Sequence, residues 1–136
     1  MTPKMDKYER EAGTEAMASV LLPHLPRGRV EAIYRAAPGN EIGKGKFENP
    51  ESSAALVANA FGFFLDRPDI LPALPGLRAI DWSVSELSLE CQLLFPWTGG
   101  RHPCLDVVIR TQGPLIGVES KRYEPYRPKK QKPHSA

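Results

Sequence analysis

The chain is poor in cysteine, and this scarcity already excludes several classes of protein. Its 136 residues include only two cysteines, Cys91 and Cys104, and both lie in apolar runs. Two cysteines do not make a disulfide framework, and no second cysteine or histidine stands at metal-ligand spacing from either of them. We therefore expect both thiols to be reduced and buried, in a cytoplasmic protein that does not use them to bind a metal.

Export and membrane signals are also missing. The first thirteen residues, MTPKMDKYEREAG, are charged and contain no apolar core of the kind a signal peptide needs. No apolar run approaches the roughly 20 residues of a membrane-spanning helix. The sequence therefore predicts no membrane partner.

Net charge is low, but it is unevenly distributed. The whole chain carries +2, whereas residues 121–136 alone hold six Lys or Arg and one Glu. The preceding residues are therefore slightly acidic. A basic tail on an acidic body fits a polyanionic partner, although many such tails are only solvated.

Length and composition predict one domain with three segments. Hydrophobic residues make up 41% and charged residues 25%, as in ordinary globular domains. We expect an N-terminal helix and a basic, glycine-rich loop over 1–47, a core over 48–126, and a disordered basic tail over 127–136. Fifteen residues follow Lys121, and they read as unstructured.

The first segment contains a helix and a cationic loop. Helical spacing of apolar residues predicts a helix over 6–22, ended by the prolines that follow. Residues 30–36 are compatible with a short strand or a helix. The GKGKF loop after them offers Lys44 and Lys46 for phosphate contacts, but it lacks the strand–loop–helix context of a nucleotide-binding loop, so a solvated loop is the alternative.

A second helix is predicted over 50–65. Asn49 is a good N-cap, Pro50 suits the first helical position, and Glu51 complements the helix dipole. The helix is apolar almost all round, so we expect it to be sandwiched in the core. Asn59, its one polar residue in mid-helix, is interpreted as a hydrogen-bonded structural residue.

Three strands follow this helix. Apolar and polar residues alternate over 84–95, and turn residues fill 96–103, where His102 is interpreted as a turn residue. Strands are then predicted over 104–111 and 115–123. The fold class is therefore α+β, with helices followed by a three-stranded antiparallel meander.

The hairpin formed by the last two strands carries the chemistry. A turn between Gln112 and Gly113 would place Asp106 directly across from Glu119, and alternation would put Lys121 on the same face as Glu119. Directly opposed like charges destabilise a sheet. Two carboxylates placed in this way, with an ammonium group beside them, therefore indicate a cation site.

Asp106 followed by Glu119-Ser120-Lys121 resembles the PD-(D/E)xK nuclease superfamily, whose fold is the restriction-endonuclease-like fold. The order of a helix and three strands, with FENPESSAALVANAFGFF, LECQLLFPWTGGRHPCLDVVIRT and IGVESKRYEP, is similar to bacterial members of that superfamily. The proline of the motif is replaced by Leu105. The crossover helix and later strand of the fold are also missing from the predicted elements.

The resemblance implies a Mg²⁺- or Mn²⁺-dependent nuclease acting on DNA. Asp106 and Glu119 would be metal ligands together with the backbone carbonyl of Ser120, and Lys121 would activate the attacking water. Glu90 and Glu51 are additional candidates for the site. The basic residues Lys44, Lys46, Arg122, Lys129 and Lys130 would contact the nucleic acid.

Other interpretations stay open at this point. The carboxylates could pair with basic neighbours on a solvated face, and the chain could be a non-catalytic nucleic-acid-binding or protein-assembly module that keeps the fold. An exposed sheet edge also suggests a homodimer or a partner that completes the sheet. A monomeric mass in light scattering at high micromolar concentration would argue against the homodimer.

Overall fold

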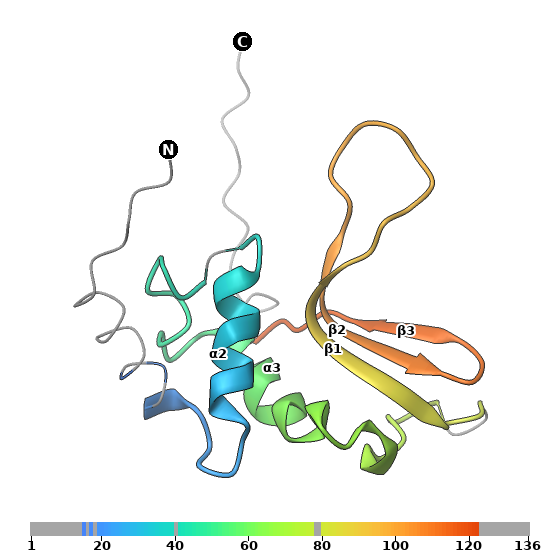
Figure 1. The fold of residues 1–136 in the computed structure, drawn as a ribbon, viewed down its shortest axis with the longest axis horizontal. Coiled ribbons are helices and arrows are strands. Elements are labelled where there is room, and N and C mark those ends of the chain that lie inside the picture. The colour runs from blue at the N-terminus through green and yellow to red at the C-terminus, as the bar shows by residue number, and fades with distance from the viewer. Residues whose placement is uncertain (1–14, 16, 18, 40, 78–79, 123–136) are drawn as a thin grey trace.

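The described part of the protein combines helices with one small sheet. The computed structural model describes residues 15, 17, 19–39, 41–77 and 80–122 (Figure 1). Its elements are α2 (Arg27–Ala36), α3 (Ser53–Phe61), the 3-10 turns η1 (Gly62–Leu65) and η2 (Pro68–Ile70), and the strands β1 (Val84–Gln92), β2 (Cys104–Thr111) and β3 (Leu115–Val118). The predicted α+β class and the order of helix and three strands are confirmed.

Some predictions fall on parts of the chain that the structure does not describe. Of the helix expected over 6–22, residues 15, 17, 19 and 20 are helical, and most of the remainder lies outside the described residues. The predicted basic tail over 127–136 lies outside them entirely. Among the helices in the described part, none is long and apolar enough to cross a membrane.

The sheet has the strand order β1-β2-β3, with both pairs antiparallel. Val107 pairs with Val118 and Arg110 with Leu115, so the predicted register of the second hairpin is confirmed. Thr111 closes the turn, because its Oγ1 accepts from the Gly113 N–H at 3.1 Å and donates to the Pro114 carbonyl at 2.7 Å.

Both outer strands are shorter than predicted. β1 ends at Gln92 rather than at residue 95: Leu93 still donates to the Pro103 carbonyl at 2.9 Å, but a proline has no N–H to return the hydrogen bond. β3 ends at Val118 rather than at residue 123. There the Ser120 N–H binds the carboxylate of Asp106 instead of a backbone carbonyl of β2.

Gly117 in β3 lies close to a side chain of β2. A Cβ atom on Gly117 would lie 2.6 Å from a methyl group of Leu105, which crosses over this position from β2. Any larger residue would therefore displace Leu105.

The core lies between the helices and one face of the sheet. Its buried residues include these from both helices and the two longer strands: Val30, Tyr34, Ala55, Val57, Ala58, Val84, Leu87, Leu89, Val107 and Ile109. Tyr34 joins α2 to α3, because its hydroxyl donates to the Ala54 carbonyl at 3.1 Å. Figure 1 shows both helices on the same side of the strands. Residues 30–36, which fitted either a strand or a helix, are helical.

The expectation that the second helix is sandwiched in the core is wrong. α3 buries Ala55, Val57 and Ala58, but Leu56 on its other side is 43% exposed and Phe63 in η1 is 45% exposed. The described residues form two layers, so a helix packed on the sheet has only one face covered.

The predicted start of this helix is also wrong. Ser52 is the N-cap, since its hydroxyl accepts from the Ala55 N–H at 3.1 Å, and it is buried. Asn49 accepts from the Glu51 N–H at 2.8 Å, which is a local turn ahead of the helix. Asn and Ser both favour capping, and here the buried serine caps the helix.

Asn59 has the structural role predicted for it. Its Oδ1 accepts from the Leu22 N–H at 2.8 Å and its Nδ2 donates to the Val20 carbonyl at 2.9 Å. The side chain therefore holds the residues that precede α2 against α3.

We expect Asn59→Ala to lower the free energy of unfolding by about 2 kcal/mol, because two hydrogen bonds are lost at about 1 kcal/mol each. Chemical denaturation measures this. Leu56→Ala, on the exposed side of the same helix, is the matched control and should cost less than about 1 kcal/mol. Equal losses in the two variants would show that Asn59 does not hold this junction.

Candidate functional site

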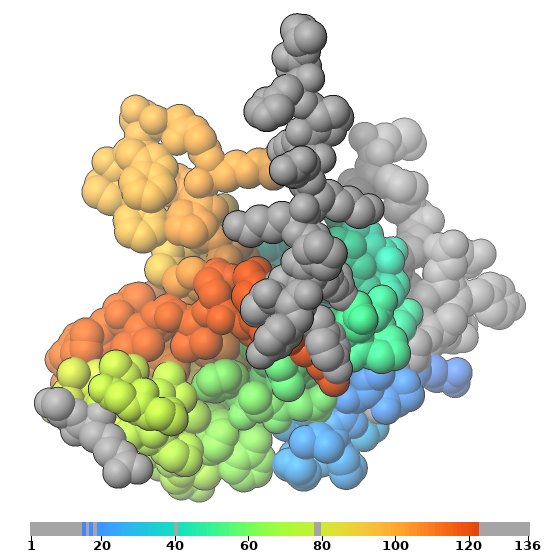
Figure 2. All heavy atoms as spheres, turned by 180° about the vertical axis from the view of Figure 1, so that it is seen from behind, coloured from blue at the N-terminus to red at the C-terminus, as the bar shows by residue number. Residues whose placement is uncertain are grey.

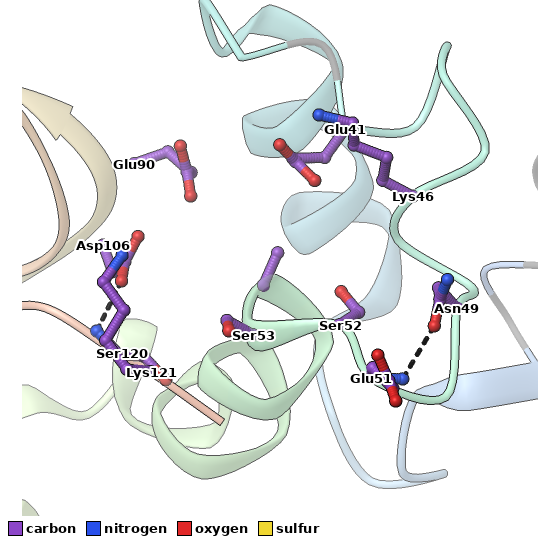
Figure 3. A pocket seen from close by; sticks show the side chains of 11 residues that line it. Glu41, Lys46, Asn49, Glu51, Ser52, Ser53, Glu90, Asp106, Ser120 and Lys121 are labelled. Carbon is purple, nitrogen blue, oxygen red and sulfur yellow. Dashed lines mark hydrogen bonds between the residues drawn. The ribbon is translucent and has the colours of Figure 1, made fainter. Parts of the chain in front are cut away.

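A polar pocket of about 450 Å³ lies between the sheet and the residues that lead into α3. In Figure 3, one wall carries Glu90, Asp106, Ser120 and Lys121, and the opposite wall carries Glu41, Lys46 and Ser52. We call these the strand wall and the loop wall. The lining consists of Glu41, Lys46, Asn49, Glu51, Ser52, Ser53, Ala54, Glu90, Asp106, Ser120 and Lys121.

Several residues predicted from the sequence meet in this pocket, and others do not. Those that line it are Asp106, Ser120, Lys121, Glu90, Glu51 and Lys46. Glu119, Lys44 and Arg122 do not line it. Lys129 and Lys130 lie outside the described residues. The pocket thus joins the second hairpin to the start of α3.

Glu90 has an unusual backbone conformation in the middle of β1. Its φ is 48°, and no other non-glycine residue in the described part of the chain has a positive φ. The ladder continues on both sides of it, with Leu89 opposite Val107 and Cys91 opposite Leu105, so Glu90 stands across from Asp106. Left-handed conformations are uncommon for residues with a side chain and are concentrated at functional sites. The observation marks Glu90 as a candidate site residue.

The electrostatic environment of Glu90 is that of a carboxylate crowded by like charges. Burial raises its pKa to about 7, and the negative charges of Asp106, Glu41 and Glu119 add to the increase. A weak hydrogen bond from the Cys104 thiol, at 3.8 Å, acts in the opposite direction. Repulsion of this kind is relieved when a cation enters the site.

The same charges reach two neighbouring groups. Burial raises the pKa of the Cys104 thiol to about 11, and the Glu90 charge contributes. Burial and the charges of Glu90, Asp106 and Glu41 also raise the pKa of Tyr34. The thiols of Cys91 and Cys104 are free and half-buried, so the prediction that they are buried is only partly met.

Asp106 has a second role besides its charge. Its Oδ2 accepts from the Ser120 N–H at 2.6 Å, across the open end of the hairpin. This bond fixes the chain just beyond β3 and so positions Lys121 on the strand wall (Figure 3).

The predicted placement of Glu119 is wrong in one respect. The alternation that would put Glu119 and Lys121 on one strand face does not apply, because β3 ends at Val118. Glu119 is exposed and does not line the pocket, although its charge is felt at Glu90. Glu90 rather than Glu119 is therefore the carboxylate that shares the pocket with Asp106.

Arg110, one of the basic residues close to these carboxylates in the sequence, has another partner. Arg110 pairs with Glu86 at 3.5 Å, and both side chains are substantially exposed. Asp106 is only partly exposed and faces the pocket.

The sequence did not point to Glu41 or to Ser52 and Ser53. Glu41 lies in the glycine-rich loop and has no spacing relation to the strands, so only the fold brings it opposite Glu90 (Figure 3). Ser52 and Ser53 had a weak signal, because a serine pair before an apolar run favours a helix start.

The donor set suits a hard divalent cation. Among the residues that the structure describes, no three His, Cys, Asp or Glu side chains form a metal-binding group. Mg²⁺ does not require three, because it usually takes one or two carboxylates and completes its shell with water and phosphate oxygens. Glu90 and Asp106 supply two. The pair therefore fits an ion that is held jointly by the protein and a phosphate ligand.

No protein-family model matches the chain, and no curated protein or solved structure shows a significant match.

The raised pKa of Glu90 predicts a pH-dependent stability. Between its usual value of 4.5 and about 7, the folded protein holds a proton that the unfolded chain has released, so stability falls as pH rises through this window. Thermal unfolding of wild type and Glu90→Gln from pH 4 to 8 measures the effect. The variant should lose this decline, and a parallel decline in both proteins would contradict it.

Proposed function

We propose that this chain is a Mg²⁺- or Mn²⁺-dependent nuclease of the PD-(D/E)xK type, with a restriction-endonuclease-like core, that hydrolyses phosphodiester bonds in DNA. The observation that carries the proposal is the meeting of Glu90, Asp106 and Lys121 on one wall of a pocket whose other wall holds Lys46 and the start of α3. This pocket joins carboxylates for a cation to positive groups for a phosphate.

Each side chain has a defined part in this proposal. Glu90 and Asp106 would hold the ion, and Asp106 would keep its hydrogen bond from the Ser120 N–H at Oδ2 while offering Oδ1 as the ligand. Bound there, Mg²⁺ would lower the pKa of a water molecule and offset negative charge on the phosphate. Lys121 places a further positive charge beside the reacting phosphate.

The loop wall would orient the phosphate. Lys46 lines it, and α3 begins there with its N-cap Ser52. The first N–H groups of a helix have no carbonyl partner within the helix. A helix N-terminus and an ammonium group both attract anions. The two walls therefore favour a bound phosphate that bridges the cation and the helix.

Cleavage of plasmid DNA tests the proposal. Wild-type protein should nick supercoiled plasmid in Mg²⁺ or Mn²⁺ and lose this activity in EDTA. Absence of nicking with both Mg²⁺ and Mn²⁺ would remove the enzymatic claim.

One observation favours a second candidate, a non-catalytic nucleic-acid-binding module. Glu119, the first residue of the ExK motif, does not line the pocket with Asp106. Such a module would bind DNA in a salt-sensitive manner without a divalent ion. The module would bind DNA equally well after Asp106→Asn and would not cleave it. The enzyme would cleave DNA only with the divalent ion and would lose this cleavage after Asp106→Asn.

A further inference from the structure

A second feature of the molecule is the long loop that joins β1 to β2. Residues 93–103 project from the body as a separate lobe in Figures 1 and 2, coloured gold to orange. The loop exposes three large apolar side chains: Leu94 is 78% exposed, Phe95 40% and Trp97 48%. Exposed groups of this kind mark binding surfaces.

The aromatic rings of the 93–103 loop are stacked in parallel. Phe95 and Trp97 have ring centroids 4.5 Å apart and an interplanar angle of 4°, and Trp97 and His102 lie 5.7 Å apart at 17°. The Phe95 N–H donates to Nδ1 of His102 at 3.1 Å, which fixes the stack at its base. Gly99 and Gly100, with φ of 86° and 78°, reverse the chain so that His102 returns to Trp97.

Charge and position favour a nucleic acid on this surface. Residues 91–105 contain no Asp or Glu, and Arg101, which precedes His102 in the sequence, is exposed. The loop also lies next to the strand wall of the pocket. It begins three residues after Glu90 of β1 and ends three residues before Asp106 of β2, and both of these residues line the pocket. Five residues of extended chain separate Gln92 from Trp97, a reach of at most about 17 Å. A strand bound at the pocket would therefore pass the loop within a few nucleotides.

We propose that the 93–103 loop is a stacking platform for unpaired bases of the nucleic acid whose phosphate occupies the pocket. This proposal rests on the proposed function and names its substrate class, a strand with single-stranded bases near the cleavage site. Flat, parallel rings stack on any base, whereas bases within a duplex are already stacked on each other. Arg101 contributes a phosphate contact without reading sequence.

Binding to two oligonucleotides tests the platform. The probes are a labelled twelve-nucleotide oligothymidylate and an abasic strand of the same length, which has the same phosphates and no bases. Anisotropy is measured without divalent ions, so that no cleavage occurs. Trp97→Ala should raise Kd for oligothymidylate about tenfold or more and leave Kd for the abasic strand unchanged. Trp97→Phe, which keeps a ring, should stay within about twofold of wild type.

Fluorescence gives an independent readout, because the chain has two tryptophans. Trp82 is tied to the Leu71 carbonyl through its indole N–H at 2.7 Å, outside the 93–103 loop. Oligothymidylate should quench the fluorescence of wild type and not that of Trp97→Phe, in which only Trp82 emits.

Three outcomes would overturn the platform: equal Kd values for wild type and Trp97→Ala, an equal loss on the abasic strand, or no binding of oligothymidylate at low salt. A Trp97-dependent dimer in light scattering, with oligonucleotide affinity unchanged, would overturn it as well and assign the surface to a second copy of the chain. Failure of the nuclease proposal looks different, because plasmid cleavage would then be absent while the Trp97-dependent binding persists.

Discussion

The Asp106→Asn variant is expected to lose at least about 100-fold in Mg²⁺-dependent DNA cleavage. Replacing partners that only orient metal ligands costs 10- to 100-fold, and Asp106 is proposed to be a ligand itself. In the wild type, the Ser120 N–H donates to Oδ2 of Asp106 at 2.6 Å. Asparagine is the informative substitution because its amide oxygen can accept the same hydrogen bond. The chain beyond β3 and Lys121 should therefore stay in place while the negative charge is lost.

Stability separates this loss from misfolding. Asp106 raises the pKa of Glu90 through its charge, so its neutralisation should leave thermal stability at pH 8 unchanged or higher. Asp106→Ala, which also removes the acceptor for Ser120, should be less stable than Asp106→Asn. Cleavage by Asp106→Asn at the wild-type rate, with the same ion requirement, would rule out Asp106 as a ligand.

The Lys121→Ala variant is expected to lose about 10²- to 10³-fold in the rate of cleavage at saturating DNA, the range found when one preorganised group that stabilises transition-state charge is removed. Lys121 is exposed and lies on the strand wall, so its replacement should not disturb the core. Single-turnover cleavage with Mg²⁺ measures the rate separately from DNA affinity.

Lys44→Ala is the matched control for Lys121. Lys44 is also an exposed lysine, but it does not line the pocket. The Lys44→Ala variant should change the affinity for DNA only slightly and leave the rate of cleavage at saturating DNA unchanged. If both variants lost affinity to the same degree and neither lost rate, Lys121 would be a phosphate contact and not part of the reaction.

The sequence predicted the pairing of the strands better than the residues at which the strands end. The register of β2 and β3 followed from a turn between Gln112 and Gly113, and the pairs from Val107–Val118 to Arg110–Leu115 confirm it. The ends of the strands depended on individual hydrogen bonds. Pro103 cannot extend the pairing with β1, and the Asp106 side chain takes the N–H that would have extended β3.

Only part of the candidate site could be predicted, because some of its residues depend on where the strands end and on how the chain folds. Asp106 and Lys121 were recognised by their spacing, and Glu90 was noted as a strand neighbour. Glu90 rather than Glu119 lines the pocket because β3 ends at Val118 and because Glu90 has a positive φ. Neither feature leaves a pattern in the sequence. Glu41 reaches the pocket only through the tertiary fold.

The central claim, that Glu90 and Asp106 hold a divalent ion beside Lys121, is tested most directly by a crystal structure of the protein with Mn²⁺. Anomalous difference density identifies the ion and its ligands. The account predicts one peak in contact with the Glu90 and Asp106 carboxylates, and no peak there in crystals of Asp106→Asn. Density at Asp106 and Glu119 without Glu90, or no density in this pocket at saturating Mn²⁺, would contradict it.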